Sequence, residues 1–199
     1  MVPTENLKDL KDYRVIITST DIFKEPLENY FANVKLIRNS VDQNIFINKR
    51  LRYPSAFTLG WAGNPRHNKY KNFDFFERLK KDLHFNFKSA TGNIKTKEGM
   101  ADFYNSIDLL VITSYSEGEP LTAIESSSCG TAAAGFNVGV IPQTTSYVSD
   151  WGYKNLRDKI LELSNEKKSK LSINARKRYD SFCNKQIIKK YWMDLLSNM

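Results

Sequence analysis

Two carboxylates, Glu117 and Glu125, flank a turn that is otherwise typical of a phosphate site. The apolar run 108–113 predicts a buried strand, Pro120 suits the first position of a helix, and Gly130 is placed to end that helix. The exposed amides and the dipole at such a helix N-terminus attract anions. Carboxylates instead accept paired hydrogen bonds from vicinal hydroxyls. The combination predicts a ligand in which a phosphate is flanked by sugars.

The face of the predicted helix indicates where Glu125 points. Leu121, Thr122 and Glu125 share one face by the i, i+3 and i, i+4 spacing, so Glu125 can face the same cleft as the turn. The alternative is that both acids are solvated residues of an amphipathic helix. Their place beside a helix N-terminus at a strand end favours the cleft.

A second polar segment, residues 63–72, supplies cations. Two acids beside a diphosphate would repel it unless positive charge intervenes, and Arg66, Lys69 and Lys71 offer that charge. Lys71 precedes a helix expected to start near Asn72, a place that lysine ordinarily avoids, so we interpret it as functional. The alternative is a solvated basic loop.

Composition indicates a folded chain with a bias toward anionic ligands. The 199 residues are 41% hydrophobic and 13% aromatic, enough for one large domain or one domain with extensions. The run of residues at the N-terminus is not a signal peptide and no long apolar stretch follows, so the expected location is the cytoplasm. Two distant cysteines argue against a metal site or a disulfide framework. The net charge of +8 suits phosphate-bearing ligands, nucleic acid or an anionic membrane.

Strands and helices alternate along most of the chain. Strands are predicted at 13–18, 34–38, 57–62, 84–88, 108–113 and 131–136, helices at 22–30, 73–83, 100–104 and 121–129, and three more helices between 155 and 198. This order predicts a doubly wound α/β domain with a parallel, Rossmann-like sheet and C-terminal helices. Ligands of such sheets bind at the carboxyl ends of the strands. The 63–72 loop and the Glu117 turn both follow strands, so both are expected at that edge.

Basic residues near the C-terminus are interpreted as a solvated helix face; they are Lys167, Lys168, Lys170, Arg176, Lys177 and Arg178. Contact with a membrane surface is the minority interpretation. Nucleic acid is not an expected partner, because the aromatic interleaving typical of its binding modules is absent here.

The segment S-E-G-E-P-L-T-A-I-E at 116–125, followed by C-G-T at 129–131, resembles the EGxPxxxxEAxxxG signature of family-4-like glycosyltransferases of the GT-B fold. Residues 39–42 with Phe46 resemble the NGVDxxxF run that starts the family's C-terminal domain. Residues 60–72 resemble its strand and loop with a lysine before asparagine or glycine, and residues 100–113 resemble the helix and strand before the signature. Trp61 stands where the family has an arginine, which leaves Arg66 as its substitute.

The resemblance implies a role for each matching residue in binding a nucleotide-diphosphate sugar. Glu125 would accept the ribose hydroxyls, Glu117 would lie by the donor sugar, and Lys71 would neutralise the diphosphate. The implied catalytic set is Glu117, Lys71 and Arg66, and the implied donor-binding set is Asn64, Gly118, Glu119, Pro120, Leu121, Thr122 and Glu125. The family is typically independent of metals and retains the anomeric configuration, so no cofactor beyond the donor is expected.

The resemblance also implies that the chain is half of an enzyme. Residues 1–38 would be the end of an N-terminal domain, 39–182 the nucleotide-sugar-binding domain and 183–199 a C-terminal helix. The expected function is transfer of a sugar to a glycan or lipid-linked acceptor, as in polysaccharide biosynthesis, with the missing N-terminal GT-B domain as partner and little or no activity alone. The alternative is a non-catalytic nucleotide-sugar-binding module that works with a partner chain. The inner face of a membrane is the alternative location.

Overall fold

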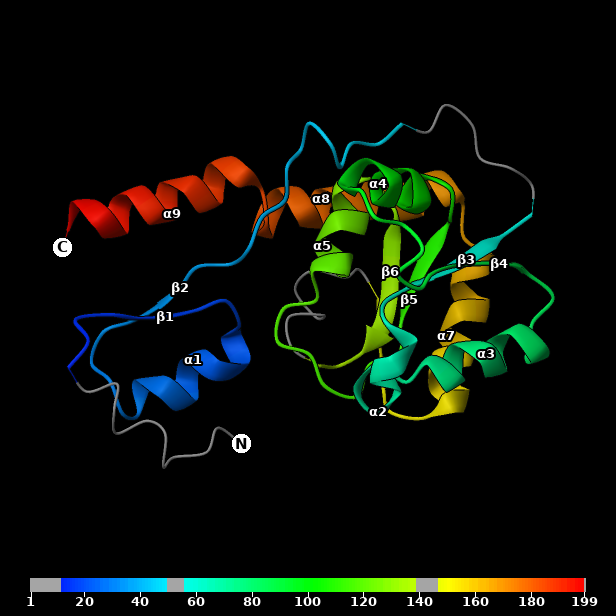
Figure 1. The fold of residues 1–199 in the computed structure, drawn as a ribbon, viewed down its shortest axis with the longest axis horizontal. Helices are drawn as coiled ribbons and strands as arrows, with labels where there is room; N and C mark the ends of the chain where they lie inside the picture. The colour runs from blue at the N-terminus through cyan, green and yellow to red at the C-terminus, as the bar shows by residue number, and fades with distance from the viewer. Residues whose placement is uncertain (1–11, 50–55, 139–146, 199) are drawn as a thin grey trace.

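Five parallel strands form the main sheet of the computed structural model, which describes residues 12–49, 56–138 and 147–198 (Figure 1). The strands are β3 (Thr58–Ala62), β4 (Asn86–Ala90), β5 (Leu109–Ile112), β6 (Ala132–Phe136) and β7 (Tyr147–Ser149). Every pair of neighbours is parallel. The central strands β5 and β6 are buried along their whole length, as their apolar and small residues require.

Helices cover both faces of this sheet, which confirms the predicted doubly wound α/β fold. The helices after β3 are α2 (Asn68–Lys71), α3 (Phe73–Asp82), α4 (Lys97–Asn105), α5 (Leu121–Ser128), α7 (Tyr153–Ser164), α8 (Lys168–Phe182) and α9 (Lys185–Ser197). Of these, α2 belongs to the loop after β3 and α9 lies away from this sheet. In Figure 1, α4, α5 and α8 lie together on one side, and α3 and α7 on the other. Phe75 of α3 packs on Tyr153 of α7 with ring centroids 4.9 Å apart.

The strand order β4-β3-β5-β6-β7 places a topological switch between β3 and β5. The chain moves outward from β3 to β4 and then returns to the other side of β3 for β5. Loops that leave β3 and β5 at their carboxyl ends therefore border one crevice, where doubly wound sheets bind ligands. These are the loops that carry Lys71 and Glu117.

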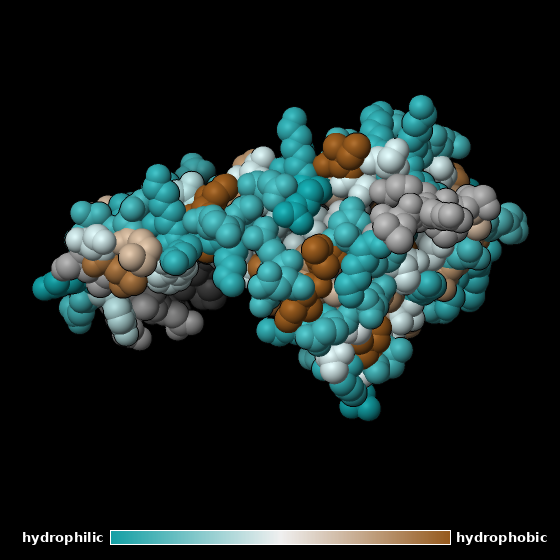
Figure 2. All heavy atoms as spheres, turned by 90° about the horizontal axis from the view of Figure 1, so that it is seen from above, coloured by the Kyte–Doolittle hydropathy of each residue, from teal (hydrophilic) through white to brown (hydrophobic). Residues whose placement is uncertain are grey.

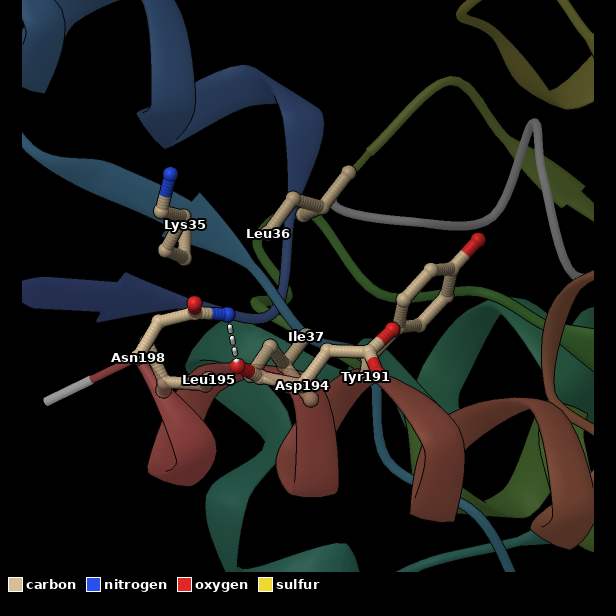
Figure 3. Close-up of a pocket in the computed structure, with 7 residues that line it drawn as sticks. All are labelled: Lys35, Leu36, Ile37, Tyr191, Asp194, Leu195 and Asn198. Atoms are coloured by element: carbon tan, nitrogen blue, oxygen red, sulfur yellow. Dashed lines mark hydrogen bonds between the residues drawn. The ribbon is translucent and has the colours of Figure 1, made fainter.

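A smaller unit precedes the main sheet. Strands β1 (Ile16–Thr18) and β2 (Val34–Leu36) pair in parallel, and α1 (Asp21–Glu28) connects them. Helix α9, although far from β2 in the sequence, lies near it in space. A hollow of 370 Å³ lies between Lys35–Ile37 and the last turns of α9 (Figure 3). In Figure 2 this unit and α9 form a narrower lobe beside the lobe of the main sheet.

Some local predictions differ from the structure, because short helical turns in a polar segment leave no periodic apolar pattern. The predicted loop 63–72 holds the 3₁₀ turn η2 (Pro65–His67) and α2, because the Asn64 side chain accepts a hydrogen bond from Arg66 N at 3.0 Å and caps the turn. The strand expected at 84–88 runs from Asn86 to Ala90. Strand β7 was not predicted, and the segment before residue 12 lies outside the described residues.

The interpretation of the basic C-terminal residues as a solvated face is wrong for Lys168. Its ammonium lies 2.8 Å from Asp108 Oδ2 and donates to the Ala56 carbonyl at 2.7 Å. The Lys168 and Asp108 side chains are only 14% and 7% exposed. Asp108 Oδ2 also accepts the Thr58 N–H at 2.9 Å, so the pair fastens α8 to the starts of β3 and β5.

Gly130 ends α5 as its sequence position predicted. Its φ is +70°, and the amides of Gly130 and Thr131 bond to the carbonyls of Ser127 and Ser126 at 3.0 and 2.8 Å, the pattern of a Schellman cap. A Cβ at residue 130 would lie 2.6 Å from Asn48 Nδ2.

Gly130→Ala is therefore expected to lower the free energy of unfolding by about 2 kcal/mol, because the left-handed backbone and the close contact both oppose a side chain. Urea denaturation measures the change. Gly118→Ala is the matched control, since a Cβ there meets nothing within 4 Å and should change stability little. Equal stability of the two variants would contradict this account of the cap.

Candidate functional site

An ion pair joins the two loops at the switch point. Lys71 Nζ lies 2.6 Å from Glu117 Oε1, and Ser114 Oγ donates to the same oxygen at 2.6 Å. The Glu117 side chain is 11% exposed and that of Lys71 is 34% exposed. The pair is thus balanced in charge, and the more accessible partner is the cation.

Hydrogen bonds between the loops hold this ion pair in place. Thr113 Oγ1 donates to the Lys71 carbonyl at 2.7 Å, and the Tyr115 N–H donates to the Tyr70 carbonyl at 2.8 Å. The buried Trp61 donates its Nε1–H to Thr113 Oγ1 at 3.0 Å. Trp61 therefore orients the threonine that binds the Lys71 backbone.

Lys71 directly precedes Asn72, the N-cap of α3, as the sequence predicted. It is also the last residue of α2, where a cation is favourable, and Asn72 with φ of 51° separates the two helices. Its position carries no local penalty that would signal function. The contact with Glu117 is the observation that now supports a role for Lys71.

The first turn of α5 lies just beyond Glu117 and has free backbone donors. Pro120 is the N-cap rather than the first helical residue, and Ala123 N bonds to its carbonyl at 2.9 Å. As the first two helical residues, Leu121 and Thr122 have N–H groups without an intrahelical acceptor. Leu121 is 49% exposed, Thr122 and Glu125 are half-buried, and Ala123 and Ile124 are buried, so the first three share the more exposed side of α5. That this side faces a ligand cleft stays a prediction.

Glu125 lies one turn further along α5 and is held by a tyrosine. Tyr104 OH donates to Glu125 Oε2 at 2.7 Å, and Oε1 has no partner within the described residues. Burial raises the pKa of the Glu125 carboxyl, although the Tyr104 hydrogen bond and the positive charge of Lys97 oppose this shift. The sequence placed Tyr104 on a helix face but did not indicate that it positions an acid.

Glu119 has a different task from its neighbours. Both of its carboxylate oxygens accept the Asn39 N–H at 3.0 Å, and the Asn39 side-chain amide donates to Oε2 as well. The turn at 39–42 is thereby tied to the Glu117 turn. This clamp between Glu119 and Asn39 occupies the Glu119 carboxylate, so a ligand at this turn would contact the backbone of Glu119 rather than its side chain.

Arg66 and Asn64 stand apart from the ion pair. Asn64 uses its side-chain oxygen to cap η2, and Arg66 is exposed with no side-chain hydrogen bond or ion pair to a described residue. The structure joins Lys71 and Glu117 at the switch point, with the start of α5 just beyond Glu117 and Glu125 one turn further along that helix. It does not add a contact from Arg66. No cluster of three or more His, Cys, Asp or Glu within the described residues could hold a metal ion.

Glu125→Gln is expected to stabilise the fold at neutral pH. Because burial raises the Glu125 pKa above its ordinary value of 4.5, the folded state binds the proton more tightly than the unfolded state. The free energy of unfolding contributed by this group therefore falls as pH rises from that value through the raised pKa. Glutamine removes the charge and can still accept the Tyr104 hydrogen bond.

Thermal denaturation across pH tests this expectation. The Glu125→Gln variant should have a higher Tm than the wild type at neutral pH, and the difference should vanish below about pH 4, where both states of the wild type are protonated. Glu25→Gln, at an exposed position of α1, is the control without a pH-dependent gain. If the Tm difference between Glu125→Gln and the wild type is smaller at neutral pH than at acidic pH, the Glu125 pKa is not raised in the folded state.

Comparisons with known proteins identify the fold. No protein-family model and no curated protein matches the chain. Among solved structures it is similar to sucrose-phosphate synthase from Thermosynechococcus elongatus, with a TM-score of 0.80 and 15% identity over 98% of this chain. It is similar to the GtfA/B complex (0.76, 18%, 98%) and to Anabaena HepE in complex with UDP and glucose (0.73, 14%, 99%).

These likenesses show that the chain shares its fold with part of each of these GT-B proteins. The chain spans 62% of the sucrose-phosphate synthase chain, 47% of the chain in the GtfA/B complex and 68% of HepE. Within the described residues, no helix is long and apolar enough to span a bilayer.

Proposed function

We propose that this chain binds a nucleotide-diphosphate sugar between the loop after β3 and the first turn of α5, as the donor-binding half of a retaining glycosyltransferase. The observation that carries the proposal is the convergence of Lys71, Glu117 and the α5 N-terminus at the switch point, with Glu125 one turn further on. The structural neighbours support a donor of this class, since HepE is in complex with UDP and glucose.

Each group has a chemical task in this proposal. The N–H groups of Leu121 and Thr122 and the Lys71 ammonium bind the diphosphate, and Lys71 stabilises the charge that develops as the sugar leaves. Glu117 accepts hydrogen bonds from hydroxyls of the donor sugar once the Lys71 ammonium also contacts the phosphate. Glu125 accepts ribose hydroxyls with Oε1, while Tyr104 keeps the carboxylate oriented.

A second GT-B half would complete the catalytic site. Among the described residues β1 and β2 pair only with each other, and an isolated two-stranded sheet is marginal. Ile17, Ile22 and Phe23 of this unit expose 37–49% of their surface. The proposal is that another domain extends this unit, supplied in the same protein or by a partner chain, as the GtfA/B complex suggests.

Acceptor and location follow from the same proposal. A glycan or lipid-linked acceptor would enter between the two halves, in the cytoplasm or at the inner face of a membrane. The second candidate, a binding module without catalysis, differs in one measurable respect: it would bind donor but transfer no sugar when the complementary half is supplied.

Thermal shift with nucleotides tests the proposal. UDP, GDP and ADP are each compared with the corresponding monophosphate, and a diphosphate at 100-fold its Kd should add about 2.7 kcal/mol of stability. At least one diphosphate should stabilise the chain more than its monophosphate does, because only the diphosphate reaches both Lys71 and α5. Equal or absent shifts for all three pairs would contradict the proposal.

A further inference from the structure

A second hollow lies at the same edge of the sheet and is not used by the donor site. It has a volume of 290 Å³ and is bordered by the residue after α2, the start of α3, and the segments that follow β5 and β7. It lies next to the switch-point loops in the chain, since Asn72 follows Lys71 and Tyr115 follows Ser114. Whatever binds here would sit beside the Lys71–Glu117 pair.

Three aromatic rings run from the core to the surface of this hollow. Phe136 is 1% exposed and lies 4.7 Å from Trp151 with 20° between the ring planes. Tyr115 lies 6.0 Å from Trp151 with 18° between the planes. Trp151 and Tyr115 are 48% and 54% exposed. The stacked rings of Trp151 and Tyr115, each left about half exposed, form an aromatic platform at this hollow.

Polar groups border the platform, and one of them lacks a partner. Asn72 is 8% exposed, and its Nδ2 has no hydrogen-bond partner within the described residues. An unsatisfied buried donor costs about 1–3 kcal/mol, so Asn72 Nδ2 would gain from a ligand acceptor in the hollow. Asp74 accepts a hydrogen bond from Asn68 at 2.6 Å through one oxygen, and Arg78 lies over the Tyr153 ring at 3.6 Å.

The composition of this border selects the class of ligand. One carboxylate and one guanidinium balance in charge, which does not favour a phosphate or another anion. A sugar ring combines an apolar C–H face, which packs on aromatic rings, with hydroxyls that pair with amide, carboxylate and guanidinium groups. The volume is close to the lower limit of small-molecule pockets, which suits a single ring with its chain continuing into solvent.

We infer that this hollow binds a pyranose ring of a glycan, with the ring packed on Tyr115 and Trp151 and a hydroxyl accepting from Asn72 Nδ2. If the proposed function holds, this glycan would be the acceptor, and that part of the inference rests on the proposed function. Binding of the sugar itself does not depend on the proposed function, because no donor-site group takes part in it.

The test is binding of the fluorescently labelled chain to a printed array of neutral pyranose oligosaccharides. Wild-type protein should bind a subset, and Tyr115→Ala and Trp151→Ala should weaken titrated binding of the best ligand about tenfold, the loss of one stacked ring. Tyr115→Phe keeps the ring and should bind like wild type. Trp192→Ala, an exposed tryptophan of α9, is the matched control and should also bind like wild type.

The outcomes separate this inference from the donor site. No binding to any oligosaccharide, or binding that Tyr115→Ala and Trp151→Ala leave intact, overturns it. Tyr115 is exposed, so its alanine variant decides the matter even where Trp151→Ala unfolds the chain. If the chain binds a glycan but no nucleotide diphosphate stabilises it, the proposed function is refuted and the carbohydrate site stands. If a nucleotide diphosphate stabilises the chain but no glycan binds, the carbohydrate site is refuted and the proposed function stands.

Discussion

Lys168→Met is expected to lower the free energy of unfolding by about 3 kcal/mol, a fall in Tm of about 6–12 °C for a chain of this size. The substitution keeps much of the side-chain volume but removes the cation that pairs with Asp108 at 2.8 Å. Asp108 would then carry a buried charge without its cation, although the Thr58 N–H would still donate to it. The strands that carry the Lys71 and Glu117 loops, β3 and β5, would lose their shared anchor.

Lys167→Met is the matched control for this prediction. Lys167 is the exposed neighbour of Lys168, so its substitution removes the same charge without exposing a buried carboxylate. Urea denaturation followed by fluorescence of the buried Trp61 reports the unfolding of the main sheet. Similar losses for the two variants, or none for Lys168→Met, would mean that the buried pair does not stabilise the fold.

Lys71→Met is expected to weaken the binding of the preferred nucleotide diphosphate by about 10- to 100-fold, as for loss of a hydrogen bond to a charged group. The loss has two causes. The diphosphate loses a cation, and Glu117, which is 11% exposed and 2.6 Å from Lys71 Nζ, is left as an unpaired negative charge beside it. Isothermal calorimetry at constant ionic strength measures the affinity.

Lys69→Met separates a specific contact from net charge. Lys69 lies in the same short helix, and its ammonium lies 5.8 Å from the Tyr70 ring rather than at Glu117. Its substitution should change the affinity by no more than about twofold. If Lys69→Met weakens binding as much as Lys71→Met, the loop acts through its general charge, and the assigned role of Lys71 is wrong.

The fold could be predicted because its signals are local and periodic. The 108–113 run, the glycine after α5 and the alternation of strands with helices each reflect burial or backbone conformation within a few residues. Short elements were missed where that signal is weak. Strand β7 has three residues, and the polar turn at 65–67 depends on one side-chain cap from Asn64.

The site could be predicted only in part, because its contacts join residues far apart in the chain. The position of Glu125 followed from helix spacing, whereas its hydrogen bond to Tyr104 did not. The clamp between Glu119 and Asn39 spans 80 residues and has no sequence pattern of its own. The platform of Tyr115 and Trp151 was missed for the same reason, since only the sheet brings the segments after β5 and β7 together.

In the proposed function, the α5 N-terminus and the Lys71 loop form one diphosphate site. The most direct test is a titration of ¹⁵N-labelled protein with UDP, GDP and ADP followed by amide chemical shifts. We expect the largest saturable shifts for the preferred diphosphate on Leu121, Thr122 and Lys71, with Ile17 of β1 unchanged. Saturable shifts confined to other parts of the chain, or none with any of the three, would contradict it.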